Sequence, residues 1–206
     1  MNTLQTSLIA LRATAVTLLL TGIGYPLVMT GAARILFPRQ AGGSLATDEN
    51  GKVVGSALIG QTFTSAAYFQ GRPSAAGSGY DATASGGSNL GPASARLRDR
   101  VKADLARLQK ENPQAPGLVP AELVTASASG LDPHLSPAAA RWQVARVAQA
   151  RAVAPERVSS ILDGQTEGRD LGFLGEPTVN VLLLNLALDR QLGRAPGSGA
   201  RAASAP

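Results

Sequence analysis

Residues 13–33 read ATAVTLLLTGIGYPLVMTGAA, a run of 21 residues between Arg12 and Arg34 that carries no charge. As a helix at ~1.5 Å per residue, this run covers about 31 Å, the thickness of a hydrocarbon core of ~30 Å. It therefore predicts a single membrane-spanning helix over residues 13–36, preceded by a short amino-terminal segment, residues 1–12. No other stretch of the chain is long and apolar enough to cross a bilayer.

Two other interpretations of this run stay open at the level of sequence. A cleaved signal peptide has a shorter apolar region, although Gly31-Ala32-Ala33 resembles a cleavage site. A buried core helix is rarely apolar on every side. Gly22, Gly24 and Pro26 cluster within the run, and small residues permit close approach of two helices, so we expect a partner-interface there.

The composition excludes several classes of protein. Charged residues make up 16% of the chain, below the ~25% of average soluble proteins, which argues against a disordered protein. The net charge of +5 comes from 16 arginines and 3 lysines against 14 acids, but the arginines are scattered and disfavour a nucleic-acid surface. Without cysteine and with one histidine, His134, the chain is expected to hold no disulfide and no metal site.

The remainder of the chain predicts one α+β domain over residues 53–193, joined to the span by a linker, residues 37–52. Leu97, Val101, Leu105 and Leu108 recur at helical spacing, and Ser136-Pro137 is typical of a helix start. The tail, residues 194–206, has no core residues and is expected to be disordered. We expect strands at 53–59 and 121–127, and helices at 93–111, 137–152, from Pro155, and at 178–192 with Gly193 as the stop.

Several local motifs have both a chemical and a structural interpretation. Residues 84–89 read ASGGSN and could offer backbone N–H groups to an anion, or simply form a tight turn. Ser127 or Ser129 with Asp132 and His134 suggests an alternative function, a membrane-anchored extracytoplasmic hydrolase. The glycine that a nucleophile elbow needs two places before the serine is missing, and Asp132-Pro133 is also typical of a turn.

Other residues predict packing rather than chemistry. Trp142 is expected in the core beside a solvent-facing Gln143. Asn180 and Asn185 interrupt an apolar helix, so we expect a strand end or another hydrogen-bonding partner next to them. Five residues form a predicted surface or loop-closing cluster in which Arg72 pairs with Asp81: Tyr68, Phe69, Arg72, Tyr80 and Asp81.

Read together, five segments resemble one family, the C subunit of the bacterial Kdp potassium-transporting P-type ATPase. They are GSALIGQTF (55–63), YFQGRPSA (68–75), YDATASGGSNLGP (80–92), LVTASASGLDPHLSPAAARWQVARVAQAR (123–151) and GEPTVNVLLLNLALD (175–189). With the apolar span, the resemblance covers nearly the whole chain.

The resemblance implies a single-pass inner-membrane protein with a cytoplasmic amino terminus and a periplasmic body. It implies three partners: a channel-like potassium-binding subunit, an ATP-hydrolysing pump subunit and a small single-span subunit. The chain itself would be a non-catalytic accessory subunit that supports assembly and is proposed to raise the pump subunit's affinity for ATP.

The resemblance also suggests site residues. Gln143 and the stretch Ser85, Gly86, Gly87 and Ser88 are the suggested nucleotide contacts, with no firmly bound cofactor and ATP met only through the complex. Tyr68, Phe69 and Arg72 join Gly22, Gly24 and Pro26 as expected partner contacts. A cap over the channel-like subunit's outer mouth is the simpler physical alternative, because a body outside the cytoplasm would meet little ATP.

Overall fold

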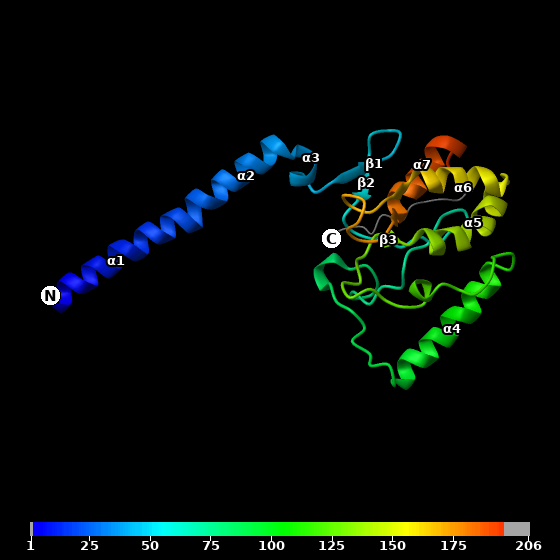
Figure 1. Cartoon of the computed structure of the whole chain (residues 1–206), viewed down its shortest axis with the longest axis horizontal. Helices are drawn as coiled ribbons and strands as arrows, with labels where there is room; N and C mark the ends of the chain where they lie inside the picture. Colours follow the sequence, from blue (N-terminus) through cyan, green and yellow to red (C-terminus); the bar gives the residue numbers. More distant parts are fainter. Residues whose placement is uncertain (1, 196–206) are drawn as a thin grey trace. The chain divides into compact units, whose positions relative to one another are not determined.

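A computed structural model describes residues 2–195, and the chain divides into two compact units. The first unit ends at Leu45 and the second begins at Ala46. Figure 1 labels the helices and strands of both units.

The first unit is dominated by one long apolar helix. It comprises α1 (Thr3–Leu19), a π-helical turn (Leu20–Gly24) and α2 (Tyr25–Leu36) without a break. By length and composition, Thr3–Leu36 can span a membrane, and no residue of its most apolar stretch is buried within the protein. The helix begins at Thr3, so most of residues 1–12 are helical too. Residues 13–36 remain our prediction for the part that lies in lipid.

The π-helical turn accommodates Pro26. Proline has no N–H, and its ring clashes with the carbonyl four residues earlier in a regular helix. Just before it, the Tyr25 N–H bonds to the Leu20 carbonyl, five residues back. This wider turn admits the proline without breaking the helix, and it falls on Gly22 and Gly24, where no side chain crowds the backbone.

The connection between the helix and the body contains short elements. After α3 (Pro38–Ala41), strands β1 (Leu45–Thr47) and β2 (Val53–Ser56) form a two-stranded sheet. The strand predicted over 53–59 ends at Ser56, because the chain then turns and the Ile59 N–H bonds to the Ser56 carbonyl at 3.3 Å.

Four helices build the body: α4 (Ala95–Glu111), α5 (Pro137–Arg151), α6 (Pro155–Gly164) and α7 (Val181–Leu192). Side chains cap three of them. Ser94, Ser136 and Asn180 accept the backbone N–H three residues later, at 3.4, 3.2 and 3.2 Å. The helices predicted from Ala93, Pro137 and Pro155 are thus confirmed, the first beginning two residues later.

Two predictions of secondary structure are wrong. Residues 121–127 are no strand: Ala121–Leu123 forms a 3₁₀ turn, and Glu122 accepts the Ser136 N–H at 3.0 Å in front of α5. The helix predicted from Thr178 starts at Val181, because Thr178–Asn180 is strand β5. Asn180 therefore stands at the strand end that its polarity predicted.

A small antiparallel sheet joins the helices. Its strands are β3 (His134–Leu135), β4 (Thr166–Glu167) and β5, in the order β3-β5-β4. The register pairs His134 with Asn180 on one side of β5 and Thr166 with Val179 on the other.

The core lies where this sheet meets α5, α6 and α7, and α6 packs against both α5 and α7 (Figure 1). The α+β fold class with one amino-terminal apolar helix is therefore confirmed. The largest fully buried apolar side chains are Phe69, Leu135, Leu162, Leu184, Leu188, Val147, Val158 and Val179.

Candidate functional site

The most unusual part of the body is an irregular segment, Ala66–Gln70, which begins in a turn and belongs to no helix or strand. Ala67, Tyr68 and Phe69 are buried, Phe69 completely. Buried backbone groups must find hydrogen-bond partners. In this segment, side chains from α5 and α7 supply them.

Two side-chain amides bind consecutive residues of the segment. Asn185 accepts the Phe69 N–H and donates to the Phe69 carbonyl, both at 2.9 Å. Gln143 accepts the Gln70 N–H at 2.9 Å and donates to the Gln70 carbonyl at 3.0 Å. Each amide thus imitates the pairing that a neighbouring strand would give.

Two arginines, Arg146 and Arg151, bind the same segment. Together with Gln143 and Asn185 they form what we call the clasp. Arg146 donates to the Ala66 and Tyr68 carbonyls at 2.6 and 3.0 Å, to Asn112 at 2.9 Å and to Gln143 Oε1 at 2.7 Å. Burial lowers the pKa of Arg146 to about 10, so the guanidinium still carries its charge at neutral pH.

Arg151 acts at the other edge of the segment. It donates to the Ala67 carbonyl and to Asp189, both at 2.8 Å, and its guanidinium lies 4.8 Å from the centre of the Tyr68 ring. The Tyr68 hydroxyl donates to the same carboxylate at 2.8 Å. Charge-assisted hydrogen bonds of this kind are roughly twice as strong as those between neutral groups.

These contacts bear directly on the predicted nucleotide contact, Gln143. The side chain is only 2% exposed, and both atoms of its amide are engaged. The expectation that Gln143 faces solvent is wrong, because α5 is buried on most of its surface rather than along one stripe.

The Gly-rich segment is tied to the turn that contains the two serines. Gly86 N–H and the Ser85 hydroxyl both donate to the Ser129 carbonyl, at 2.8 and 3.0 Å. A Cβ on Gly87 would lie 3.0 Å from the Ala128 carbonyl oxygen. Glycine at position 87 lets the two backbones pack closely. Ser88, the last of the suggested nucleotide contacts, belongs to the same segment.

The serine hydroxyls of the suggested hydrolase site accept backbone N–H groups of the turn in which they lie. Ser127 Oγ accepts the Gly130 N–H at 2.9 Å, and Ser129 Oγ accepts the Leu131 N–H at 3.1 Å. Among residues 2–195, no hydrogen bond joins either serine to His134. Nucleophilic catalysis needs that contact between nucleophile and base.

Arg72 pairs with Asp132 rather than with the predicted Asp81. The Asp132 carboxylate lies 3.0 Å from Arg72 Nη1 and 3.6 Å from His134 Nδ1. The hydrogen bond from the His134 imidazole has the largest effect on Asp132 and lowers its pKa. The backbone N–H of His134 and the Arg72 guanidinium lower it further, to about 2, against the opposing effect of burial. The predicted Arg72–Asp81 pair is wrong, since Asp81 caps its own turn by accepting from Thr83 at 2.9 Å.

Tyr80 closes the loops around this ion pair. Its hydroxyl donates to the Arg72 carbonyl at 2.6 Å, and burial raises its pKa to about 12. A Cβ on Gly60 would lie 2.5 Å from the Tyr80 ring, and one on Gly71 2.7 Å from the hydroxyl. The loop-closing role predicted for this cluster thus holds for Tyr80 and Arg72.

The expected partner contacts fall into two groups. Gly22, Gly24 and Pro26 lie on the long helix. Gly22 and Pro26 are exposed, and Gly24 is half-buried. Arg72 is partly exposed. Tyr68 and Phe69 are buried in the body, 7% and 0% exposed, so the free body does not present them at its surface.

The body contains a cavity of about 490 Å³ between α4 and the loops 61–64 and 70–80. Asp104, Arg107 and Glu111 line one side, and Arg107 is paired with both acids, at 3.5 and 3.1 Å. Gln143 reaches this cavity, but Ser85–Ser88 does not. The structure therefore does not bring the two suggested nucleotide contacts into one pocket.

Other predictions concern metal binding and the tail. Across the part of the chain that the structure describes, no three His, Asp or Glu side chains gather in a way that could hold a metal ion. Of the tail, residues 194–206, all but Arg194 and Ala195 lie outside the described residues. Ala195 is buried against Ala67 and Tyr68, so the ordered body extends slightly beyond Gly193.

Sequence reasoning missed Arg146, Arg151 and Asn112. The available signal was the position of Arg146, four residues after the core residue Trp142 on the same helix. An arginine on a buried helix face needs several acceptors nearby. Their identity could not be predicted, because the acceptors are backbone carbonyls about 80 residues earlier.

Comparison with known proteins assigns the chain to a family. The family described as "K+-transporting ATPase, c chain" matches residues 7–190. Similar proteins are the potassium-transporting ATPase KdpC subunits of Myxococcus xanthus, 63% identical over 96% of both chains, and of Rhodospirillum rubrum, 57% identical over 84% of this chain and 89% of that protein. The corresponding subunit of Methylobacterium nodulans is 56% identical over 85% of this chain and 92% of that protein. The chain therefore belongs to the family of K+-transporting ATPase c chains.

Proposed function

We propose that the chain is a non-catalytic accessory subunit that supports assembly of the potassium-transporting ATPase and caps the path by which potassium enters it. The observation that carries this proposal is the clasp around Ala66–Gln70. The side chains suggested for chemistry, Gln143 above all, are used to hold a rigid body together. Such a body is suited to docking on larger subunits.

We further propose the membrane arrangement that the resemblance implies. The long helix crosses the inner membrane once, the amino terminus is cytoplasmic and the body is periplasmic. The partners are the channel-like potassium-binding subunit, the ATP-hydrolysing subunit and the small single-span subunit. Thr3–Leu36 supports a single-pass anchor by its length and apolar composition.

The alternative is a role in raising the pump subunit's affinity for ATP through Gln143 and Ser85–Ser88. Two observations weigh against direct contact. Gln143 would first have to give up its bonds to Gln70 and Arg146. Ser85 and Gly86 would have to leave the Ser129 carbonyl.

A truncation separates the two roles. The complex is reconstituted with the full chain or with a chain that stops after Leu45, which keeps the anchor and removes the body. The KM of the ATPase for potassium and its KM for ATP are then measured separately.

A capping role predicts a raised KM for potassium with an unchanged KM for ATP, and an assembly role predicts that the complex falls apart without the body. A raised KM for ATP alone would favour the nucleotide role. An intact complex in which neither constant changes would refute the proposed function.

A further inference from the structure

The loop between β4 and β5 exposes a compact group of large apolar side chains. Leu171, Phe173 and Leu174 are 83%, 69% and 49% exposed. Single exposed leucines are common on protein surfaces, but three large apolar residues within four positions of one turn are not. We call residues 168–176 the apolar hairpin.

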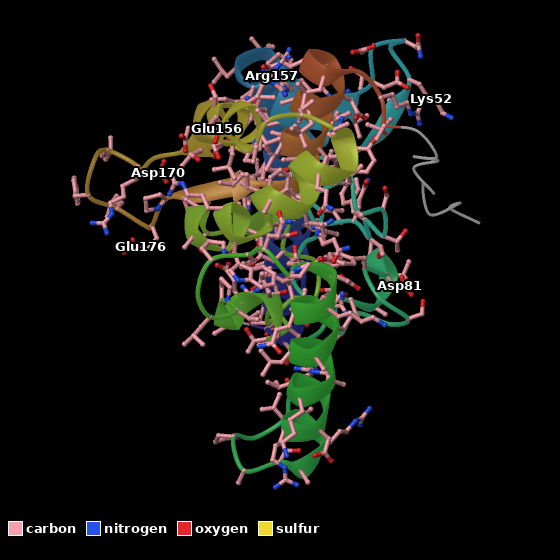
Figure 2. The ribbon with its side chains drawn as sticks, turned by 90° about the vertical axis from the view of Figure 1, so that its right-hand side faces the viewer. Lys52, Asp81, Glu156, Arg157, Asp170 and Glu176 are labelled. Atoms are coloured by element: carbon pink, nitrogen blue, oxygen red, sulfur yellow. The ribbon has the colours of Figure 1, made fainter. Side chains whose placement is uncertain are left out.

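The apolar hairpin is an ordered structure. Asp170 and Leu174 exchange two backbone hydrogen bonds of 2.9 Å, and Arg169 reaches the Glu176 carboxylate at 2.8 Å. Figure 2 shows Asp170 and Glu176 on this hairpin, which projects from the body clear of the helices. The apolar side chains are therefore presented at a defined tip.

The turn at the tip places a leucine where asparagine, aspartate or glycine is usual. Leu171 and Gly172 both have positive φ, 53° and 83°, at the centre of a turn closed by the Phe173 N–H and the Asp170 carbonyl. Asn-Gly and Gly-Gly are the sequences such turns prefer, since they relieve strain at both positions. The chain instead keeps a leucine whose backbone is strained and whose side chain is exposed to solvent. Neither the strain nor the exposure stabilises the free body.

We propose that the apolar hairpin docks its tip into an apolar pocket with a basic rim on a larger subunit of the same ATPase. This inference rests on the assembly role proposed above. The charge around the tip supports it: Glu167, Asp170 and Glu176 are opposed only by Arg169, in a chain whose net charge is +5. Elements that lie on anionic lipid are rich in Lys and Arg instead.

The absence of cysteine from the chain makes a direct test simple. A Phe173→Cys variant of the chain is labelled with a benzophenone maleimide, then assembled into the complex and irradiated. The matched control is Leu118→Cys, a leucine that is 92% exposed in another loop of the body. We expect a cross-link to a larger subunit from position 173 and none from position 118.

Three results would overturn the proposal: a cross-link from position 173 to lipid only, a cross-link to a second copy of this chain only, or equal cross-linking from both positions. The first two results would give the tip a different neighbour, and the third would show that it has no specific neighbour. None of them would affect the assembly role, which the truncation after Leu45 tests by itself.

A second measurement examines the energetics of docking. Leu171→Gly with Phe173→Ser removes the two most exposed apolar side chains of the tip and favours the same turn, so the body should fold unchanged. With an affinity tag on the ATP-hydrolysing subunit, we expect at least a tenfold loss of this chain on dilution, and no loss for Leu118→Ser. Retention equal to the unsubstituted chain would refute docking by the hairpin, while loss on truncation would still uphold the assembly role.

Discussion

Replacement of Gln143 by leucine distinguishes a structural from a nucleotide-binding role. The substitution leaves the Gln70 N–H, the Gln70 carbonyl and one N–H of Arg146 without partners. Each unsatisfied buried group costs about 1–3 kcal/mol, and water can reach part of Gln70, so we expect a loss of about 3 kcal/mol of unfolding free energy. For a body of this size, that corresponds to a fall in melting temperature of about 6–12 °C.

The assay uses the only tryptophan of the chain, Trp142, which is buried beside Gln143 and reports unfolding of the body by fluorescence. The full chain is melted in detergent. Gln149→Leu, on the exposed side of the same helix, is the matched control and should change the unfolding free energy by less than about 0.5 kcal/mol.

The conservative variant Gln143→Glu keeps an oxygen that can accept from both the Gln70 N–H and Arg146 but loses the donor to the Gln70 carbonyl, so its loss should be smaller. The reasoning is refuted if Gln143→Leu melts like the control. A melting temperature that does not change, combined with a raised KM for ATP in the complex, would make Gln143 a ligand rather than a clasp.

Three further predictions concern the same body. Asn185→Leu should cost more than Gln143→Leu in the same melt, because it strips both partners from the backbone of Phe69, which is fully buried. Gly130→Ala should cost about 2–4 kcal/mol, since Gly130 has a φ of 67° and its new Cβ would lie 2.6 Å from the Gly86 carbonyl oxygen. Gly91→Ala, with open space around it, should be neutral by comparison. Because the pKa of Asp132 falls from 3.8 to about 2 on folding, its stabilisation is complete above about pH 5 and is lost as the pH falls through about 2. Allowing for partial exposure, this contribution is about 1 kcal/mol, and Asp132→Asn should remove it from the pH dependence of the melt.

Local signals predicted much of the fold. Ser136-Pro137 marks a helix start by its chemistry alone, and α5 begins there. The spacing of apolar side chains at positions 97, 101, 105 and 108, by four, four and three residues, likewise located α4. Asn180 and Asn185 were recognised as polar groups that needed partners, and both found them.

Non-local contacts account for what the sequence could not predict. Apolar residues at 121–127 suggest a strand, but a strand needs a neighbour, and Glu122 is instead used to bind the start of α5. Gln143 looked solvent-facing because its acceptor and donor lie in a segment 73 residues earlier. Arg72 pairs with Asp132 rather than with Asp81, and this pairing depends on how loops that are distant in the sequence pack together.

The clasp has a consequence for the order in which the body forms. Phe69 is fixed by Asn185, which is 116 residues further along the chain. The middle of the body therefore has no stable arrangement until α7 has been synthesised, and contacts of such long range slow folding. Shortening the protein from its carboxyl end would release the interior rather than trim an edge.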